Sequence, residues 1–526
     1  MQSARTSFVV AAALLALAPV SATALAPAPL QDAFPDAALV PSVPQPATPA
    51  KRSIDAHGDL IALGVPADTS VGPNPGTVAL FERGDDLTWS EVALLTPSTP
   101  TSAVGSSVAL DEDRLLSGAL ELQTASVFER QPDGSWIEAG LLQPPATTPT
   151  AEFGAYCDID GDRAVVLSLD DSSSGVDAGT LWIFEREAGG TWALADSVPL
   201  LDGNGLAFLA KGVVLSGDRA FVSAQEIHLP PLFSYPGAIQ VYRRQSTGAW
   251  QRTGQISAPT VGEAFASTGF DFDGTHLAVT ATLSVGGRIY ILRDDAIAGF
   301  TLVDTITAAP VGTLVRKLGR SMRLGGGRLV TLTASFSGVE LYEREPDGDD
   351  YELVAELAVP VGAQATDVVL TQAGDLAGVL VSSATWDESP VLAYTAGTLL
   401  HGTPELSLAA GGAHDLLLRG GESGAGAAYL VVGSATGAAP AVPLGGGVTI
   451  GIVPDAYTDL TLALAAPISG AAGVLGPNGA ANATFALPAG FAPALAGTAL
   501  FHAYLAIDTT TFQVAASNTV RLDLVP

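Results

Sequence analysis

The sequence has a single cysteine, Cys157, so no disulfide can form within the chain. Lysine occurs only at Lys51, Lys211 and Lys317, and charged residues make up 15% of the 526 residues, against roughly 25% in an average soluble domain. The formal net charge of −31 would repel a phosphate backbone, so we expect no nucleic-acid partner. With 48% hydrophobic residues, the chain is expected to fold.

Long segments free of helix-breaking residues are also scarce. The chain contains 58 glycines and 35 prolines, and no stretch after the N-terminal segment shows convincing helical periodicity. The later apolar stretches are interrupted by glycine and proline, so we expect no transmembrane anchor. The composition therefore predicts an all-β protein.

Motifs of common catalytic and cofactor sites are missing too. The sequence holds no P-loop, H-E-x-x-H, G-x-S-x-G or C-x-x-C pattern, and its six histidines are scattered. Asp55, His57 and Asp59 alternate, so on a strand they would share one face, and we interpret them as a solvated strand end. Catalysis is therefore not predicted from motifs, although a site built from several repeats would escape such a search.

The N-terminus reads as a secretory signal. Arg5 precedes the apolar segment 8–19, and Ala22-Thr23-Ala24 matches a signal-peptidase cleavage site. We expect residues 1–24 to be removed on export. The mature protein is then expected to be secreted or to lie at the cell surface.

What the sequence does contain is a repeat of roughly 50 residues. Each copy has an apolar strand with an aromatic or leucine residue at one fixed place, usually before a basic residue: Phe81, Phe128, Phe184, Tyr242, Leu292, Tyr342 and Tyr394. A second aromatic follows in the first six copies: Trp89, Trp136, Trp192, Trp250, Phe300 and Tyr351. Two such strands around a short glycine-rich turn predict a β-hairpin.

Another pair of short apolar strands precedes each hairpin. Its turn is Gly58-Asp59 in the first copy and Gly161-Asp162-Arg163 in the third. Seven units of four strands predict a seven-bladed β-propeller, in which each blade buries its faces against its neighbours. The seventh unit is short, so we expect the segment 37–43 to supply the strand that closes the ring.

These units resemble the FG-GAP repeats of integrin α subunits and of bacterial surface proteins. The resemblance covers about residues 34–403 and rests on Phe153-Gly154, Val104-Gly105, Gly118-Ala119, Gly64-Val65-Pro66 and the G-D-R turns. Kelch-type propellers are the competing family, since they also use units of this length. The resemblance implies an extracellular interaction or adhesion protein.

Integrin-type units carry Ca²⁺ on a D-x-D-x-D-G loop, and this chain departs from that pattern. The nearest approach is Asp158, Asp160 and Asp162. We expect these aspartates to accept hydrogen bonds from the backbone of their own turn. The alternative is a Ca²⁺ site, the one cofactor considered for this chain.

One long loop, 225–237, is the candidate recognition element. We expect this loop to project from the face of the propeller that also carries the connections between blades. Its residues Glu226, His228, Phe233 and Tyr235 are candidate ligand-binding residues. The alternative is that the loop packs over the blade rim or against the C-terminal domain.

From about residue 404 the composition shifts to alanine, glycine, leucine and valine. Short strands are expected at 414–420, 427–435, 458–465, 483–488, 501–508 and 519–525. We therefore predict a propeller over 25–403 and a small antiparallel β-sandwich over 404–526.

Three functions are compatible with this sequence. The first is a secreted or cell-surface scaffold that presents propeller loops to a protein or glycan. The second is an exported propeller hydrolase or lyase acting on polysaccharide. The third is a calcium-dependent adhesin. A cluster of three or more ionisable residues with perturbed pKa at the propeller axis would favour the enzyme.

Overall fold

The computed structural model describes residues 32–526, with the following gaps: 34, 36, 44–52, 67–75, 85–86, 99–102, 121–122, 146–151, 170–178, 202–207, 227–236, 261–262, 283–286, 296–298, 308–317, 334–337, 345–347, 358, 360–362, 373–375, 384–390, 396–398, 402–404, 420–424, 446–447, 477–478, 510–511 and 513. Over these residues, no helix is long and apolar enough to cross a membrane.

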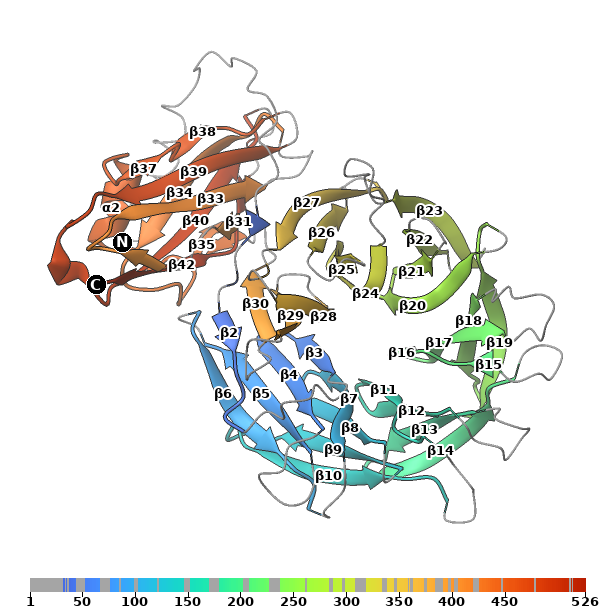
Figure 1. Cartoon of the computed structure of the whole chain (residues 1–526). Coiled ribbons are helices and arrows are strands. Elements are labelled where there is room, and N and C mark those ends of the chain that lie inside the picture. The colour runs from blue at the N-terminus through green and yellow to red at the C-terminus, as the bar shows by residue number, and fades with distance from the viewer. Residues whose placement is uncertain are drawn as a thin grey trace.

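Seven antiparallel sheets follow one another along the chain (Figure 1). Six contain a meander of four consecutive strands, and the seventh has three consecutive strands and one from the N-terminal segment. Blades 1 to 3 are β3 (Ile54–His57), β4 (Leu60–Val65), β5 (Thr77–Arg83) and β6 (Trp89–Leu95); β7 (Val104–Asp111), β8 (Arg114–Ala119), β9 (Thr124–Arg130) and β10 (Trp136–Leu142); and β11 (Tyr156–Asp160), β12 (Arg163–Ser168), β13 (Thr180–Arg186) and β14 (Trp192–Pro199). Blade 4 is β16 (Val213–Ser216), β17 (Arg219–Glu226), β18 (Gly237–Arg244) and β19 (Trp250–Ser257), with β15 (Phe208–Leu209) also on β17.

Blades 5 to 7 complete the series. They are β20 (Ala264–Phe272), β21 (His276–Thr282), β22 (Gly287–Asp295) and β23 (Gly299–Thr307); β24 (Leu318–Gly325), β25 (Arg328–Thr333), β26 (Val339–Arg344) and β27 (Tyr351–Leu357); and β28 (Ala363–Leu370), β29 (Leu376–Ser383) and β30 (Val391–Thr395). The seventh blade takes its fourth strand from the N-terminal segment, because β2 (Ala37–Leu39) pairs antiparallel with β30. A further short strand, β1 (Asp32–Ala33), adds in parallel to β27.

The first strands of the seven sheets form a closed circle. Each contacts the first strand of the next blade, and β28 of blade 7 contacts β3 of blade 1. Seven hydrophobic cores lie one between each pair of neighbouring blades, including a core that joins Leu39 and Val391 of blade 7 to Ile61 of blade 1. This arrangement is consistent with a seven-bladed β-propeller.

The aromatic repeat has a common structural cause. In blades 1 to 6 the third and fourth strands share a β-bulge, and the bulge lies beside the aligned residue, as at Leu80/Phe81 and Ile183/Phe184. The aligned residues are buried in the cores between blades, as Phe81, Phe184 and Tyr242 show. The bulge bends each blade at one place, which explains the nearly constant distance to the second aromatic.

The glycines of the F-G and G-A motifs are required where blades meet. A Cβ atom on Gly118 would lie 2.2 Å from the carbonyl oxygen of Gly154 in the next blade. A Cβ on Gly64 would lie 2.1 Å from the carbonyl oxygen of Gly105. Gly105 and Gly154 also have φ values of +88° and +90°, which other residues rarely adopt. These motifs therefore serve the close packing of adjacent blades.

The basic residue that ends the third strand joins neighbouring blades. Arg130, Arg186 and Arg244 each donate two hydrogen bonds to a glutamate of the preceding blade. The acceptors are Glu82 and two further glutamates, Glu129 and Glu185. The F-E-R pattern therefore has a structural role, because its arginine and glutamate side chains bond neighbouring blades to each other.

The C-terminal domain contains two larger sheets and a two-stranded one. The first sheet has the order β31 (Leu399–His401), β33 (Gly412–Arg419), β39 (Ala480–Leu487), β37 (Ile468–Ser469). The second has the order β32 (Glu405–Ser407), β42 (Val520–Val525), β40 (Ala499–Ile507), β34 (Ala428–Ser434), β38 (Ala472–Val474), with β41 (Val514–Ala516) on β40. The hairpin is β35 (Val442–Gly445) and β36 (Val448–Ile450).

Three details of this domain differ from the expectation. Strands β32 and β42 run parallel, so the second sheet is mixed and not purely antiparallel. Strand β31 lies before the expected boundary at 404 but pairs with β33 of the C-terminal domain. The strand expected at 458–465 is wrong, because helix α2 (Ala456–Leu462) occupies most of it. Its capping box, Asp455 with Thr458, satisfies the first free N–H groups and so favours a helix there.

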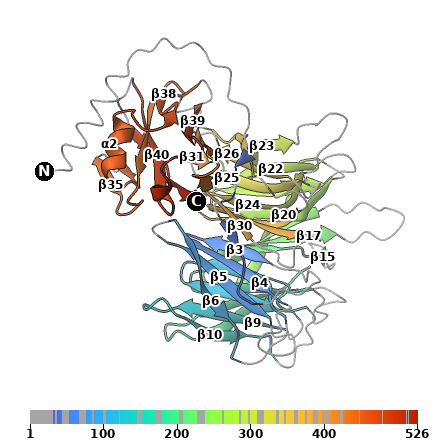
Figure 2. The ribbon, with the colours of Figure 1, turned by 60° about the vertical axis from the view of Figure 1, so that its left-hand side comes forward.

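The C-terminal domain lies beside the rim of the ring (Figure 2). Leu417 of β33 joins the core between blades 6 and 7, and Leu87 of blade 1 packs against a core of the C-terminal domain. A cavity of about 360 Å³ lies at this junction and is lined by Trp89 and by Arg521 and Asp523 of β42. The two parts therefore pack against each other through apolar side chains.

Candidate functional site

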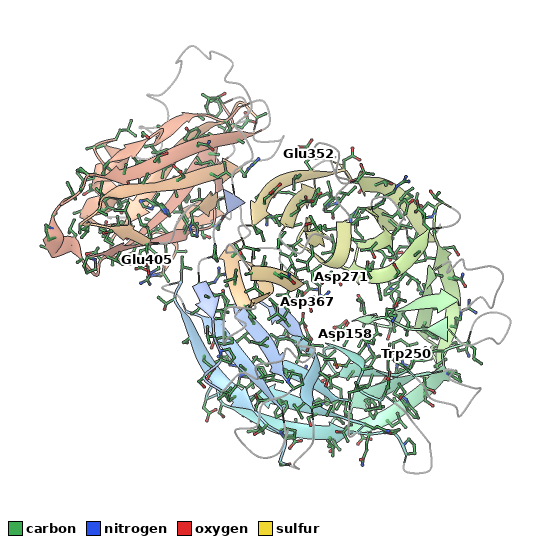
Figure 3. All side chains as sticks on the ribbon, viewed as in Figure 1. Asp158, Trp250, Asp271, Glu352, Asp367 and Glu405 are labelled. Carbon is green, nitrogen blue, oxygen red and sulfur yellow. The ribbon has the colours of Figure 1, made fainter. Side chains whose placement is uncertain are left out.

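A cavity of about 580 Å³ lies at the axis of the propeller, within the circle of first strands. All seven blades contribute to its lining. Its ionisable side chains, apart from Tyr156 and Cys157, are Asp55, Asp158, Lys211, Asp271, Arg323 and Asp367. Figure 3 shows Asp158, Asp271 and Asp367 on the inner side of the ring. The volume is in the range of roughly 300–1,000 Å³ that small-molecule sites occupy.

Three of these carboxylates and the arginine stand at one level of the ring. Asp55, Asp158 and Asp271 each pair with the third residue of the second strand in their blade. Arg323 of β24 takes the same place, opposite Val330. Alternation along a strand sends every second side chain to the same face, so equivalent positions bring these four groups to one ring of the cavity wall.

Each aspartate at this level joins its own blade to the next one, so blade 1 is joined to blade 2, blade 3 to blade 4 and blade 5 to blade 6. Asp158 accepts hydrogen bonds from the backbone N–H of Ile159, at 2.9 Å, and of Leu215 in blade 4, at 2.6 Å. Asp271 does the same with Phe272 and with Leu324 of blade 6. Asp55 accepts from Leu110 of blade 2 at 2.7 Å. Both carboxylate oxygens of Asp158 and Asp271 are therefore already used by the backbone.

Asp367 of blade 7 is placed differently. Its Oδ1 atom accepts from the Ser321 hydroxyl at 2.6 Å and from the Val368 N–H at 2.9 Å. Among the described residues, no hydrogen bond reaches its Oδ2 atom. Arg323 donates through Nη1 to the carbonyl oxygen of Met322 at 2.9 Å, which uses one of five guanidinium N–H groups.

The enclosed position of these groups changes their acidity. Burial raises the pKa of Asp55 to about 6, although Arg323 and the Leu110 N–H act in the opposite direction. Burial raises the pKa of Asp158 well above its usual range, and the negative charge of Asp55 adds to the effect. The pKa of Asp271 is raised for the same first reason, with Arg323 lowering it.

Arg323 stays charged despite its enclosure. Burial alone would lower its pKa, but the surrounding carboxylates, first of all Asp367, raise the pKa above its ordinary value. The cavity is therefore a polar chamber with one fixed positive charge near its wall and several carboxyl groups around it.

The rest of the lining is partly hydroxyl-bearing and partly apolar. Ser53 and Ser107 donate to carbonyl oxygens of the next blade, Gly105 and Gly154. Tyr156 and Val214 supply partly exposed apolar surface. The lone thiol, Cys157, is buried, and burial raises its pKa to about 12, which keeps it unreactive.

The three aspartates proposed for Ca²⁺ have separate roles. Asp158 joins blades 3 and 4, Asp160 accepts from the Gly217 N–H at 2.5 Å, and Asp162 forms an ion pair with Arg114. Among the described residues, no three His, Cys, Asp or Glu side chains form a group that could hold a metal ion. Each of these carboxylates contacts a different neighbour, so the described residues do not gather the three side chains into the Ca²⁺ site that was considered as the alternative. We expected bonds to the backbone of their own turn, but Asp158 and Asp160 accept from the next blade, and within the described part of the chain the only bond of Asp158 to its own blade is to the N–H of Ile159.

The candidate residues of the loop 225–237 lie mostly outside the described residues. His228, Phe233 and Tyr235 fall in the gap 227–236, and Glu226 is described only as the last residue of β17, paired with Phe208. Their role as ligand-binding residues remains a prediction from the sequence.

The sequence interpretation did not bring the residues of the cavity together: it considered Asp158 only as a Ca²⁺ ligand and Asp55 only as part of a solvated strand end, and it did not single out Arg323 or Asp367. Asp55, Asp158 and Asp271 each lie three positions before the glycine of their turn, at Gly58, Gly161 and Gly274. Aligning the seven units on this turn would have shown them in blades 1, 3 and 5, with Arg323 at the same place in blade 6. Asp367 carries no such signal, because the turn of blade 7 is longer.

The protein has the β-propeller fold. Solved structures similar to it include a putative 6-phosphogluconolactonase from Bacteroides uniformis (16% identity, TM-score 0.41, covering 61% of this chain and 89% of that chain) and the WD40 domain of coronin from Toxoplasma gondii (11%, 0.44, 70% and 87%). The β-propeller domain of the Trilobed protease from Pyrococcus furiosus is another (10%, 0.40, 65% and 94%). No family model and no curated protein matches the chain, so the FG-GAP assignment stays a prediction.

Proposed function

We propose that this chain is a secreted or cell-surface interaction protein, with an FG-GAP-like propeller that takes its ligand, a protein group or a glycan, at the axial cavity. The observation that carries this proposal is the convergence of ionisable side chains from six blades on one cavity of about 580 Å³. A concave site with a few convergent polar groups is where small ligands and terminal groups bind. The secretory signal in residues 1–24 supports an extracellular partner.

A second function, the exported hydrolase or lyase acting on polysaccharide, is favoured by one specific observation. Three carboxyl groups in the cavity, those of Asp55, Asp158 and Asp271, have raised pKa values. Raised pKa values are typical of acid catalysts. Against this, both oxygens of Asp158 and of Asp271 accept backbone hydrogen bonds, which leaves them poorly placed to exchange protons with a substrate. We therefore prefer binding.

The test is a glycan and protein array probed with the mature chain and two glycine variants. Gly269 lines the cavity, has ordinary backbone geometry, and a Cβ atom there would meet its nearest atom at 3.6 Å, so Gly269→Leu should fold and fill part of the cavity. Gly254 on β19 has no atom within 4 Å of such a Cβ, so Gly254→Leu is the matched control.

We expect the array signal to disappear with Gly269→Leu and to remain with Gly254→Leu. Equal binding by both variants would place the ligand elsewhere, and a variant that lacks residues 227–236 would then test the long loop. Turnover of an arrayed polysaccharide, measured as released reducing ends, would favour the enzyme instead.

A further inference from the structure

We propose that the axial cavity binds the terminal residue of a neutral glycan, and that Asp367 and Arg323 bind two adjacent hydroxyl groups of that sugar. This inference rests on the proposed function and names its ligand class. It follows from unused hydrogen-bonding groups, from the charge of the cavity and from the character of its wall.

The unused groups form a donor beside an acceptor. The Oδ2 atom of Asp367 accepts no hydrogen bond from the described residues, and most N–H groups of Arg323 are likewise unused there. Asp367 accepts a hydrogen bond from Ser321, which lies two residues before Arg323 on β24, and all three residues line the same cavity, so Asp367 and Arg323 occupy neighbouring parts of its wall. A carboxylate that accepts from one hydroxyl and a guanidinium that donates to the next would together match a vicinal diol.

The charge of the cavity disfavours an ionic ligand. Four carboxyl side chains and two cationic ones line it, and an anion would add to the repulsion between carboxylates that already helps to raise the pKa of Asp158. A cation would meet the fixed positive charge of Arg323, which stands at the same level of the ring as Asp55, Asp158 and Asp271. A neutral ligand rich in hydroxyl groups avoids both costs and still uses the donors and acceptors.

The wall also offers apolar surface. The side chains of Tyr156 and Val214 line the cavity and are partly exposed, and Val108 and Val213 also line it with small exposed fractions. A pyranose ring has polar edges and apolar C–H faces, so a chamber with both kinds of surface suits it. A polar ligand without apolar faces would leave this part of the wall without a partner.

The experiment is isothermal titration calorimetry of the full mature chain with a panel of methyl glycosides. The probes are the methyl glycosides of glucose, galactose and mannose, their 2-, 3- and 4-deoxy counterparts, glucuronate and glucosamine. We expect one of the three neutral glycosides to bind, and removal of one hydroxyl of its diol to weaken binding by about tenfold or more, because buried polar groups then lose their partner.

Two variants test the named residues. Asp367→Asn keeps the size of the side chain and a carbonyl oxygen for Ser321 and Val368, and Arg323→Gln removes the charged fork. Each is expected to weaken binding of the glycoside by about tenfold or more. The matched controls carry the same changes outside the cavity: Asp133→Asn in an exposed turn of blade 2, and Arg293→Gln, which pairs with Asp349. Both are expected to bind like the unchanged chain.

Each other outcome overturns the inference. Binding that survives both Asp367→Asn and Arg323→Gln would remove these residues from the site, and preferential binding of glucuronate or glucosamine would contradict a neutral ligand. If no glycoside binds but the array gives a signal that Gly269→Leu abolishes, the proposed function stands and the sugar inference fails. If the array signal is also insensitive to Gly269→Leu, both fail.

Discussion

The Asp158 carboxylate in blade 3 accepts a hydrogen bond of 2.6 Å from the backbone N–H of Leu215 in blade 4. The same contact joins blade 1 to blade 2 and blade 5 to blade 6, through Asp55 and Asp271. Seven is odd, so this alternation cannot continue around the ring, and blade 7 breaks it. There Asp367 bonds instead to Ser321, in the blade before it, and its Oδ2 atom accepts no hydrogen bond from the described residues.

Metal removal should leave the propeller unchanged. Because the Asp158 and Asp160 side chains already accept hydrogen bonds from the next blade, we expect neither chelator nor added Ca²⁺ to move the melting temperature of the mature chain by more than about 1 °C. Differential scanning calorimetry with EDTA and with millimolar CaCl₂ measures this. An increase of several degrees in the melting temperature with Ca²⁺ would contradict this prediction and favour the third function, a calcium-dependent adhesin.

The pKa of Asp55 predicts that acid favours the propeller. Its folded value, about 6, lies above the ordinary 3.8, so the native state binds more protons between these two pH values. The contribution of Asp55 to the free energy of unfolding therefore falls as the pH rises from 4 to 7, by up to about 3 kcal/mol.

Urea unfolding followed by tryptophan fluorescence reads this effect, since all six tryptophans precede residue 404. The free energy of unfolding of the unchanged chain, relative to Asp55→Asn, should fall between pH 4 and pH 7. A difference that stays constant, or that rises over this range, would contradict the raised pKa.

The C-terminal domain should respond to acid in the opposite direction. His502 is buried, its Nε2 atom lies 2.8 Å from the Tyr457 hydroxyl, and His414 lies beside it with ring centroids 6.0 Å apart. Burial lowers the pKa of His502 to about 4, so the unfolded state binds more protons between pH 4 and 6.5. Stability from His502 is fully present above pH 6.5 and is lost as the pH falls towards 4, by up to about 3 kcal/mol.

Hydrogen exchange of the β40 amides measures the stability of that domain separately. Relative to His502→Gln, protection of β40 should decrease from pH 7 to pH 4.5 once intrinsic exchange rates are corrected. Unchanged relative protection over this range would show that His502 does not titrate as its burial predicts.

The motif glycines should tolerate no side chain. In Gly118→Ala the new Cβ would lie 2.2 Å from the backbone oxygen of Gly154 and 2.4 Å from the Ser107 hydroxyl, so two blades must separate. We expect the free energy of unfolding to fall by about 1–3 kcal/mol. Gly254→Ala, with open space around its Cβ, should change it by less than about 0.5 kcal/mol. Equal urea midpoints for the two variants would contradict the role assigned to the motif.

The repeat made most of the fold predictable. Phe81, Phe128 and Phe184 mark the same bulge in successive blades, so their phase in the sequence reports a real geometric constant. The helix α2 was missed because its signal is local: the capping box of Asp455 and Thr458 outweighs an apolar pattern that also suits a strand. Strand β31 was assigned to the propeller because nothing in its three residues shows that it pairs with β33.

The candidate site was not predictable from any single segment. Asp367 and Arg323 come from different blades, and their roles depend on which of their atoms other blades leave unused. An aspartate in one of seven repeats has no distinguishing signal in the sequence, because its neighbours in the cavity come from other repeats. The long loop with Phe233 and Tyr235 was predicted as the recognition element because its aromatic residues lie together in one short segment of the sequence.

The most direct test of the axial site uses the methionine methyl signal. Methionine occurs only at Met1 and Met322, and Met322 lines the cavity, so the mature chain labelled with ¹³C-methyl methionine gives a single signal from the axis. We expect this signal to shift when the mature chain is saturated with the ligand identified on the array. A saturated chain whose Met322 signal does not move would show that the ligand binds elsewhere, and would contradict the axial cavity as the working site.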